Sequence, residues 1–262
     1  MDFRIRGRVA FVAGGSKGMG RDAALALGAE GCKVLVVARE QGAIDAVVAE
    51  IKAAGGEAAG ISADLCTQDG VAKALDTCNS LWSMPDIVVS QTNDTQFGKA
   101  LSMDPAILED TFRVLTMSAV YLAQATIPAM QARKWGRFVH IGSIAAREPE
   151  RHFPHAAANV ARPATSGFLK TLASEVAADG VTVNTIAPGW TLTPSLEMFF
   201  GKSGWTIDQG NEWLRKTIGV PAARAGTSEE LGSTVAFLCS EQAGYITGTW
   251  IPVDGGNHAS IM

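Results

Sequence analysis

Short apolar runs rich in β-branched residues alternate with longer stretches of helical periodicity along the chain. Several runs are apolar at successive positions, which is typical of strands covered on both faces. We expect strands at 8–14, 33–39, 58–64, 86–90, 137–143, 181–189 and 250–256. We expect helices near 20–30, 41–54, 67–82, 105–133, 155–179 and 228–240. This alternation predicts an α/β fold with a parallel sheet and right-handed crossovers.

One long segment, 190–225, departs from the alternation. It follows the carboxyl end of an expected strand, which is where ligands bind in open α/β sheets. Its aromatic residues are Trp190, Phe199, Phe200, Trp205 and Trp213. They could line an apolar pocket above a ligand, which would favour a hydrophobic or ring-containing substrate. Alternatively, they pack the segment onto its own body.

Composition and charge exclude several classes of protein. The 262 residues are 47% hydrophobic and 18% charged, and the net charge is −4, which is ordinary for a globular protein. No long run of one charge marks a surface for nucleic acid or an anionic membrane. No secretory signal and no apolar run of the roughly 18 residues needed for a membrane span are found. The four cysteines lack CxxC spacing, so we expect reduced core thiols, a cytoplasmic protein and no metal site.

A glycine-rich loop, AGGSKGMGR at 13–21, joins the first expected strand to the first expected helix. Its glycines are Gly14, Gly18 and Gly20, with Ser16, Lys17 and Met19 between them. Glycine allows a tight turn and lets a diphosphate approach bare backbone, and the helix N-terminus offers unpaired N–H groups. The loop therefore predicts dinucleotide binding, with a purely structural turn as the alternative.

The second expected strand ends in Arg39, nineteen residues after Gly20. An NAD site would be expected to place Asp or Glu about here, whereas arginine would pair with the 2′-phosphate of NADP. Lys17 adds a second cation at this corner. We therefore expect NADP(H) to be favoured over NAD(H). Two solvated surface cations remain the alternative, and Glu40 counts against a phosphate site.

Further motifs extend this pattern to the C-terminus. They are Asp64–Leu65 after the third strand, IGS ending at Ser143, VTVNTIAPG followed by Thr191 and Thr193, and YITGTWIPVDGG. With the loop GGSKGMG, they resemble the single-domain short-chain dehydrogenase/reductase family over nearly the whole chain. The resemblance implies one Rossmann-like domain over 1–262, a doubly wound parallel sheet in three layers. It also implies hydride transfer between nicotinamide and a carbonyl/alcohol pair, and assembly as a homo-oligomer, a tetramer or a dimer.

The resemblance also assigns contacts with the cofactor. Asp64 and Leu65 would touch the adenine, and Pro188, Gly189, Thr191 and Thr193 would line the nicotinamide. For each of these residues, ordinary packing at the end of a strand is the alternative.

The catalytic residues of the family are largely missing. The family carries Tyr-x-x-x-Lys on the helix after the fifth strand, but no such motif exists in this chain. Counting back from Gly167 puts Ala158 at the tyrosine position and Arg162 at the lysine position. Leu115 replaces the asparagine usual on the preceding long helix, and the Asn-Asn-Ala-Gly run is replaced by Ser90-Gln91-Thr92-Asn93. Ser143 alone remains, although a divergent branch of the family carries an asparagine and an arginine much like Asn159 and Arg162.

Arginine can keep the lysine's role of holding the nicotinamide ribose, but it cannot carry a proton because its pKa lies above about 12. The best substitute proton donor on the same helix is His155, seven residues before Arg162 and so on the same face. A solvated or capping histidine is the alternative, and His152 is a weaker candidate. Pro163 predicts a kink or frayed turn, because it lacks an N–H for the carbonyl of Asn159.

Three functions follow from these residues. The first is an NADP(H)-dependent oxidoreductase acting on a carbonyl or secondary alcohol of a small substrate, with Ser143, His155 and Arg162 as its catalytic set. The second is a non-redox lyase, dehydratase or isomerase on the same scaffold. The third is a catalytically silent cofactor-binding protein.

Overall fold

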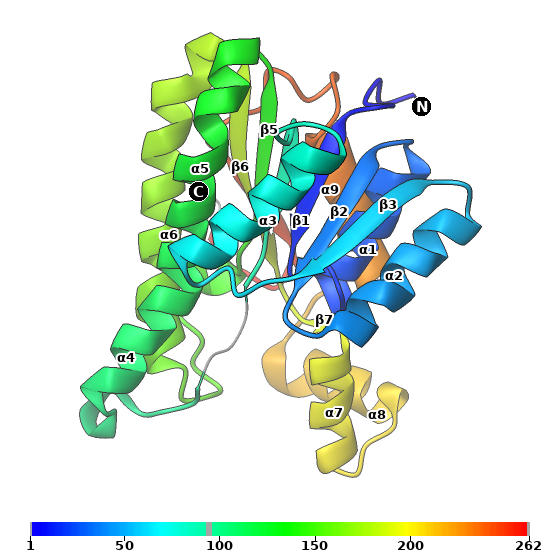
Figure 1. Cartoon of the computed structure of the whole chain (residues 1–262). Helices are drawn as coiled ribbons and strands as arrows, with labels where there is room; N and C mark the ends of the chain where they lie inside the picture. The colour runs from blue at the N-terminus through cyan, green and yellow to red at the C-terminus, as the bar shows by residue number, and fades with distance from the viewer. Residues whose placement is uncertain (1, 93–95, 261–262) are drawn as a thin grey trace.

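The computed structural model describes residues 2–92 and 96–260, which form a parallel sheet between two layers of helices (Figure 1). The sheet has seven strands in the order β3-β2-β1-β4-β5-β6-β9. They are β1 (Val9–Ala13), β2 (Lys33–Ala38), β3 (Glu57–Ser62), β4 (Ile87–Ser90), β5 (Gly136–Ile141), β6 (Val181–Pro188) and β9 (Trp250–Val253). Every pairing is parallel, and the strand order reverses between β1 and β4. The predicted Rossmann-like, three-layer architecture is therefore confirmed.

Each face of the sheet carries its own apolar core. Alternate residues of β1 show this, because Ala10 and Val12 pack into one core while Phe11 packs into the other. The first core includes α1 (Gly18–Ala29), α2 (Gln41–Ala53) and α9 (Ser228–Leu238). The second includes α3 (Gln68–Leu81), α5 (Ser118–Arg133) and α6 (Ala156–Val176). Burial on both faces is why the strands are apolar at successive positions.

The helical segment before β5 is less regular than expected. Instead of one helix over 105–133, α4 (Pro105–Phe112) is followed by a π-helical turn, Arg113–Met117, and then by α5. The wider turn carries Leu115. In α6, by contrast, the helix continues through Pro163, so the predicted fraying does not occur.

The segment 190–225 folds into a small unit beyond the carboxyl ends of the strands (Figure 1). It contains β7 (Thr191–Leu192), α7 (Pro194–Lys202), α8 (Ile207–Trp213) and a π-helical turn, Leu214–Ile218; β7 pairs with β8 (Gly226–Thr227). Its apolar core is formed by Leu196, Phe200, Leu214, Val220 and Ala225. Trp190, Phe199, Trp205 and Trp213 pack against this core. Within the described ranges, no helix is both long and apolar enough to cross a membrane.

Candidate functional site

The glycine loop lies where the strand order reverses, between β1 and α1. Gly14 and Gly18 have φ angles of +65° and +51°, in the left-handed region that favours glycine. A Cβ at Gly20 would collide with the carbonyl oxygen of Gly14 and lie 2.6 Å from Gln91 Oε1. No side chain caps the N-terminus of α1, and its first turn holds no acidic residue. The loop thus presents backbone amides and a positive helix end, as predicted for a diphosphate site.

A groove of about 430 Å³ extends from this loop across the ends of β1, β2 and β3. Nine of the predicted cofactor residues line it: Gly14, Ser16, Lys17, Gly18, Met19, Arg39, Asp64, Leu65 and Thr193. Gly20 lies behind the loop, where it permits the close approach of Gly14. Sequence reasoning did not single out Cys66 and Arg113, which also line the groove. The structure therefore gathers residues from four separate segments into one elongated site.

One corner of the groove carries both signs of charge. Arg39 lines it at the end of β2, and Lys17 lies opposite in the glycine loop. Lys17 Nζ is 2.6 Å from Glu40 Oε2, and both side chains are more than half exposed. The glutamate that counted against a phosphate site is thus paired with the cation that counted for one. A pair so exposed contributes little stability, so a ligand can compete for Lys17.

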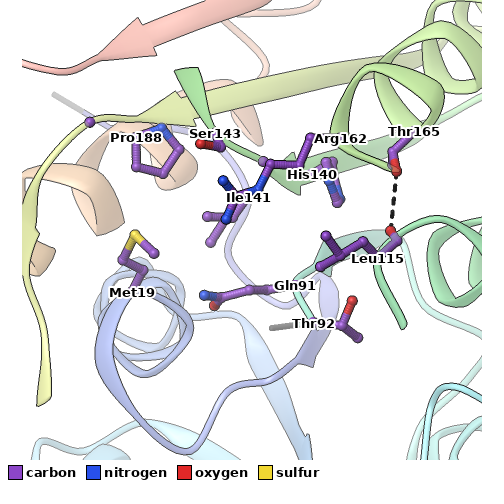
Figure 2. Close-up of a pocket in the computed structure, with 12 residues that line it drawn as sticks. Met19, Gln91, Thr92, Leu115, His140, Ile141, Ser143, Arg162, Thr165 and Pro188 are labelled. Atoms are coloured by element: carbon purple, nitrogen blue, oxygen red, sulfur yellow. Dashed lines mark hydrogen bonds between the residues drawn. The ribbon is translucent and has the colours of Figure 1, made fainter. Parts of the chain in front are cut away.

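A second cavity of about 130 Å³ adjoins the groove and shares Met19, Gln91 and Thr92 with it (Figure 2). Besides Met19, four predicted residues line it: Ser143, Arg162, Pro188 and Gly189. Thr191 does not line it; its hydroxyl lies 3.5 Å from the carbonyl oxygen of Gly189. Of the residues expected to line the nicotinamide, Pro188 and Gly189 thus line this cavity, whereas Thr191 does not.

Arg162 projects from α6 into this cavity, and Figure 2 shows its guanidinium among the other lining side chains. Its guanidinium has no hydrogen bond or ion pair within the described residues, and among them no other lining side chain is charged. Burial lowers the pKa of the Arg162 guanidinium, and the negative charge of Glu150 partly offsets this shift. A desolvated cation with five unused N–H donors is costly unless a ligand supplies acceptors.

Ser143 follows β5 at the mouth of the cavity. Its Oγ accepts a hydrogen bond from the backbone N–H of Ala145 at 3.1 Å, so Ser143 caps the short helical turn Ile144–Ala146. The bond uses an oxygen lone pair and leaves the hydroxyl hydrogen available to a ligand. Ser143 therefore has a local capping role and still has a hydroxyl hydrogen that a ligand could accept.

The position that the sequence assigned to the family's tyrosine, Ala158, lies in apolar packing. Ala158 is fully buried and belongs to one cluster with Val114, Leu115 and Ala161. The Thr165 hydroxyl, which also lines the cavity, already contacts the carbonyl oxygens of Leu115 and Ala161, at 3.2 and 3.0 Å. No hydroxyl replaces the missing phenol on this side of the cavity within the described residues.

His155 and Asn159 lie outside the cavity. His155 is the N-cap residue of α6 and its ring contacts Phe97 at a tilted angle, with ring centroids 4.4 Å apart, and neither of its ring nitrogens has a hydrogen-bond partner in the described structure. Burial and the charge of Arg162 lower its pKa. The amide of Asn159 binds the backbone N–H and carbonyl of Glu150, both at 3.1 Å. His155 shares a helix face with Arg162, but two helical turns separate them by about 10 Å. The geometry lends no support to His155 as the proton donor.

His140 lines the cavity instead, and sequence reasoning missed it. It lies on β5 and is 7% exposed, with Nδ1 3.3 Å from the Oγ of Ser90 on β4. Burial lowers its pKa from 6.5 to about 4. A histidine between the apolar residues Val139 and Ile141, three residues before Ser143, was the signal available in the sequence.

The aromatic residues of 190–225 contact one another and Phe153, with Trp190–Trp213 centroids 5.4 Å apart and Phe153–Phe199 centroids 5.5 Å apart. None of them lines the groove or the cavity. Of the two interpretations of these aromatics, packing of the segment onto its own body is the one observed. The observation that favoured a hydrophobic or cyclic substrate thereby loses its basis.

Comparison with known proteins places this site in a family. The family model described as enoyl-(acyl carrier protein) reductase matches residues 13–258. The chain belongs to the short-chain dehydrogenase/reductase family. It is 33% identical over 248 residues to the short-chain reductase protein NovJ of Streptomyces niveus, covering 95% of this chain and 93% of that one. It is 30% identical to the 3-oxoacyl-(acyl-carrier-protein) reductase FabG of Pseudomonas aeruginosa, covering 98% of this chain and 99% of the other.

Solved structures of short-chain dehydrogenase/reductases show the same fold. L-Sorbose reductase from Gluconobacter frateurii, complexed with NADPH and L-sorbose, superimposes with a TM-score of 0.92 at 30% identity over all of both chains. A 3-oxoacyl-(acyl-carrier-protein) reductase from Agrobacterium tumefaciens with NADP bound gives 0.88 at 30% identity, covering 97% of this chain and 95% of that one.

Proposed function

We propose that this short-chain dehydrogenase/reductase is an NADP(H)-dependent oxidoreductase acting on a carbonyl or secondary alcohol of a small substrate. The observation that carries the proposal is the continuity between the glycine-loop groove and the cavity of Ser143 and Arg162. A dinucleotide needs this arrangement, with an anion site at one end and a polar pocket at the other. The two similar reductases with NADPH or NADP bound support the same cofactor class here.

The residues present fit a dinucleotide at the phosphate end. The amides of Ser16 to Gly18 and the N-terminus of α1 would hold the diphosphate, and Asp64 and Leu65 would contact the adenine. Arg39 and Lys17 would pair with a 2′-phosphate, which NAD lacks. Two cations against one glutamate at this corner favour NADP(H) over NAD(H).

At the other end, Pro188, Gly189 and Thr193 would flank the nicotinamide, and the ribose hydroxyls would accept from Arg162. A bound NADPH would supply the hydride and solvent water the proton that completes the alcohol, while the protein would supply orientation and electrostatics. Ser143 would orient the reacting oxygen through its hydroxyl hydrogen. The Arg162 cation would stabilise negative charge developing on that oxygen.

Calorimetry with NADPH and NADH tests the cofactor, and absorbance at 340 nm tests turnover. The substrate panel is an acetoacetyl thioester, a ketohexose and a cyclic ketone, chosen to span the substrates that the relatives' names indicate. We expect NADPH to bind at least tenfold more tightly than NADH and at least one carbonyl to be reduced. Ser143→Ala is the matched variant and should lose turnover while keeping NADPH affinity. Tighter binding of NADH would refute the cofactor preference, and NADPH binding without any turnover would refute the reaction.

One observation favours a second function. Ala158 and Leu115 replace polar residues of the family with apolar contacts, so the usual proton donor is absent. A lyase, dehydratase or isomerase would suit such a site, and so would a silent cofactor-binding protein. A product of unchanged oxidation state, formed without net consumption of NADPH, would identify the non-redox enzyme.

A further inference from the structure

We propose that His140 Nε2–H donates a hydrogen bond to the reacting oxygen of the substrate, beside the hydroxyl of Ser143. The inference rests on the proposed function and adds a residue to its site. It concerns the hydrogen bond alone and requires no transfer of a proton from the imidazole.

The position of His140 follows from the sheet. β4 and β5 are parallel neighbours, and Ser90 is the register partner of His140. Paired residues of adjacent strands project to the same face, so the hydroxyl and the imidazole meet at the carboxyl edge of the sheet. Figure 2 shows His140 beside Arg162, in the same cavity as Ser143. The ring is therefore held by its strand and by Ser90, not by a mobile loop.

The hydrogen bond between Ser90 and His140 favours one tautomer. Ser90 is 3% exposed, and its hydroxyl has no partner other than His140 Nδ1 in the described part of the chain. If Nδ1–H donated to Ser90, the serine hydrogen would be a buried donor without an acceptor. If Ser90 donates to Nδ1, only an oxygen lone pair is unused, and this is the less costly deficit. The second arrangement places the imidazole hydrogen on Nε2.

Nε2 is then an unused donor on a ring that lines the cavity. No hydrogen bond of Nε2 is found among the described residues. Nε2 is also not one of the fully buried polar atoms that lack a partner. Burial lowers the pKa of the imidazole and keeps it neutral, although a hydrogen bond of the charged form with the Ser90 backbone opposes this shift. Arg162 of α6 is the charged residue that lines the same cavity. Ser90 is the polar contact from β4, and Leu115 is the neighbour from the π-helical turn. A neutral imidazole can polarise a carbonyl through its N–H without being protonated.

Gln91 also lines the cavity with an amide donor, but the groups around the tyrosine position of the family do not offer one. Ala158 and Leu115 carry no donor, and Thr165 already contacts two backbone carbonyls. Arg162 has spare N–H groups, but the proposed function gives these to the ribose and leaves Arg162 to act on the oxygen through its charge, not through a hydrogen bond. His140 is thus an uncommitted donor that shares the cavity with Ser143.

Three variants test the role: His140→Phe removes both nitrogens at similar volume, His140→Gln keeps an N–H₂ near Nε2, and Ser90→Ala removes the partner of Nδ1. The assay uses the panel carbonyl that the unchanged protein reduces fastest. We expect kcat/KM to fall by about 100-fold in His140→Phe, as for loss of one donor to a developing oxyanion. NADPH affinity should stay within twofold, and His140→Gln should recover most of the activity. Unchanged kcat/KM in a folded His140→Phe, or equal losses in the Phe and Gln variants, would overturn the proposal.

A second measurement does not depend on turnover. Nitrogen-15 NMR of histidine-labelled protein reports which imidazole nitrogen carries the hydrogen. We expect His140 to be neutral with its hydrogen on Nε2 at pH 7, and Ser90→Ala to lose this preference. A hydrogen on Nδ1 would overturn the proposal. If no panel carbonyl is reduced by the unchanged protein, the proposed function fails, whereas the NMR result still decides the hydrogen-bond geometry of His140.

Discussion

Burial of His140 should make the stability of the protein depend on pH in a predictable direction. Its imidazole has a folded-state pKa of about 4, against 6.5 for the ordinary side chain, because burial penalises the charged form. Above pH 6.5 both folded and unfolded states hold it neutral. Between pH 6.5 and 4 the unfolded state binds a proton that the folded state excludes. The free energy of unfolding must therefore fall as the pH falls through this window and change no further below about pH 4.

The magnitude follows from the two pKa values. Each unit of pKa difference corresponds to about 1.36 kcal/mol, so the full effect of His140 is about 3 kcal/mol. Most of it, about 2 kcal/mol or more, should be lost between pH 7.5 and pH 4.5. This is a large part of the stability of a typical domain.

Urea unfolding of the unchanged protein and of His140→Gln, across pH 7.5 to 4.5, isolates this contribution. Glutamine does not titrate, so carboxylates and the other histidines contribute equally to both proteins and cancel in the difference. We expect the variant to lose less stability on acidification, by about 2 kcal/mol. Parallel pH profiles would refute the reasoning, since they would show that His140 is not held neutral by burial.

Three further predictions concern the cofactor site. Gly20→Ala should weaken NADPH binding at least tenfold in calorimetry, because its Cβ would displace the loop, whereas Gly42→Ala, at a position with open space, should leave affinity unchanged. Glu40→Gln should tighten NADPH binding about threefold but not NADH binding, because it frees Lys17 for the 2′-phosphate; equal effects on both cofactors would contradict this. Arg162→Met should raise the free energy of unfolding by on the order of 1 kcal/mol, since an unpaired buried cation is removed, while abolishing turnover; lower stability in urea would contradict this.

Local patterns determined most of the architecture of this protein. Apolar runs predict the strands, because burial on both faces imposes the same requirement along a whole strand. The glycine loop is equally predictable from the sequence. Gly14 and Gly18 need positive φ angles, and a Cβ at Gly20 would collide with nearby residues of the loop and of the adjacent strand end. Counting along one helix to Ala158 and Arg162 likewise predicts that the family's tyrosine and lysine are replaced, and this stays a prediction.

Contacts between distant segments were decided only by the tertiary structure. Helical periodicity placed His155 on the face of Arg162, yet the start of α6 packs on Phe97 and keeps that ring out of the cavity. The pairing of β4 with β5 brings Ser90 to His140, across 50 residues that no local pattern links. The aromatic residues of 190–225 pack against one another, because their segment forms its own apolar core. Sequence periodicity indicates which face of an element is apolar. How the elements pack decides which partner covers this face and which polar groups meet there.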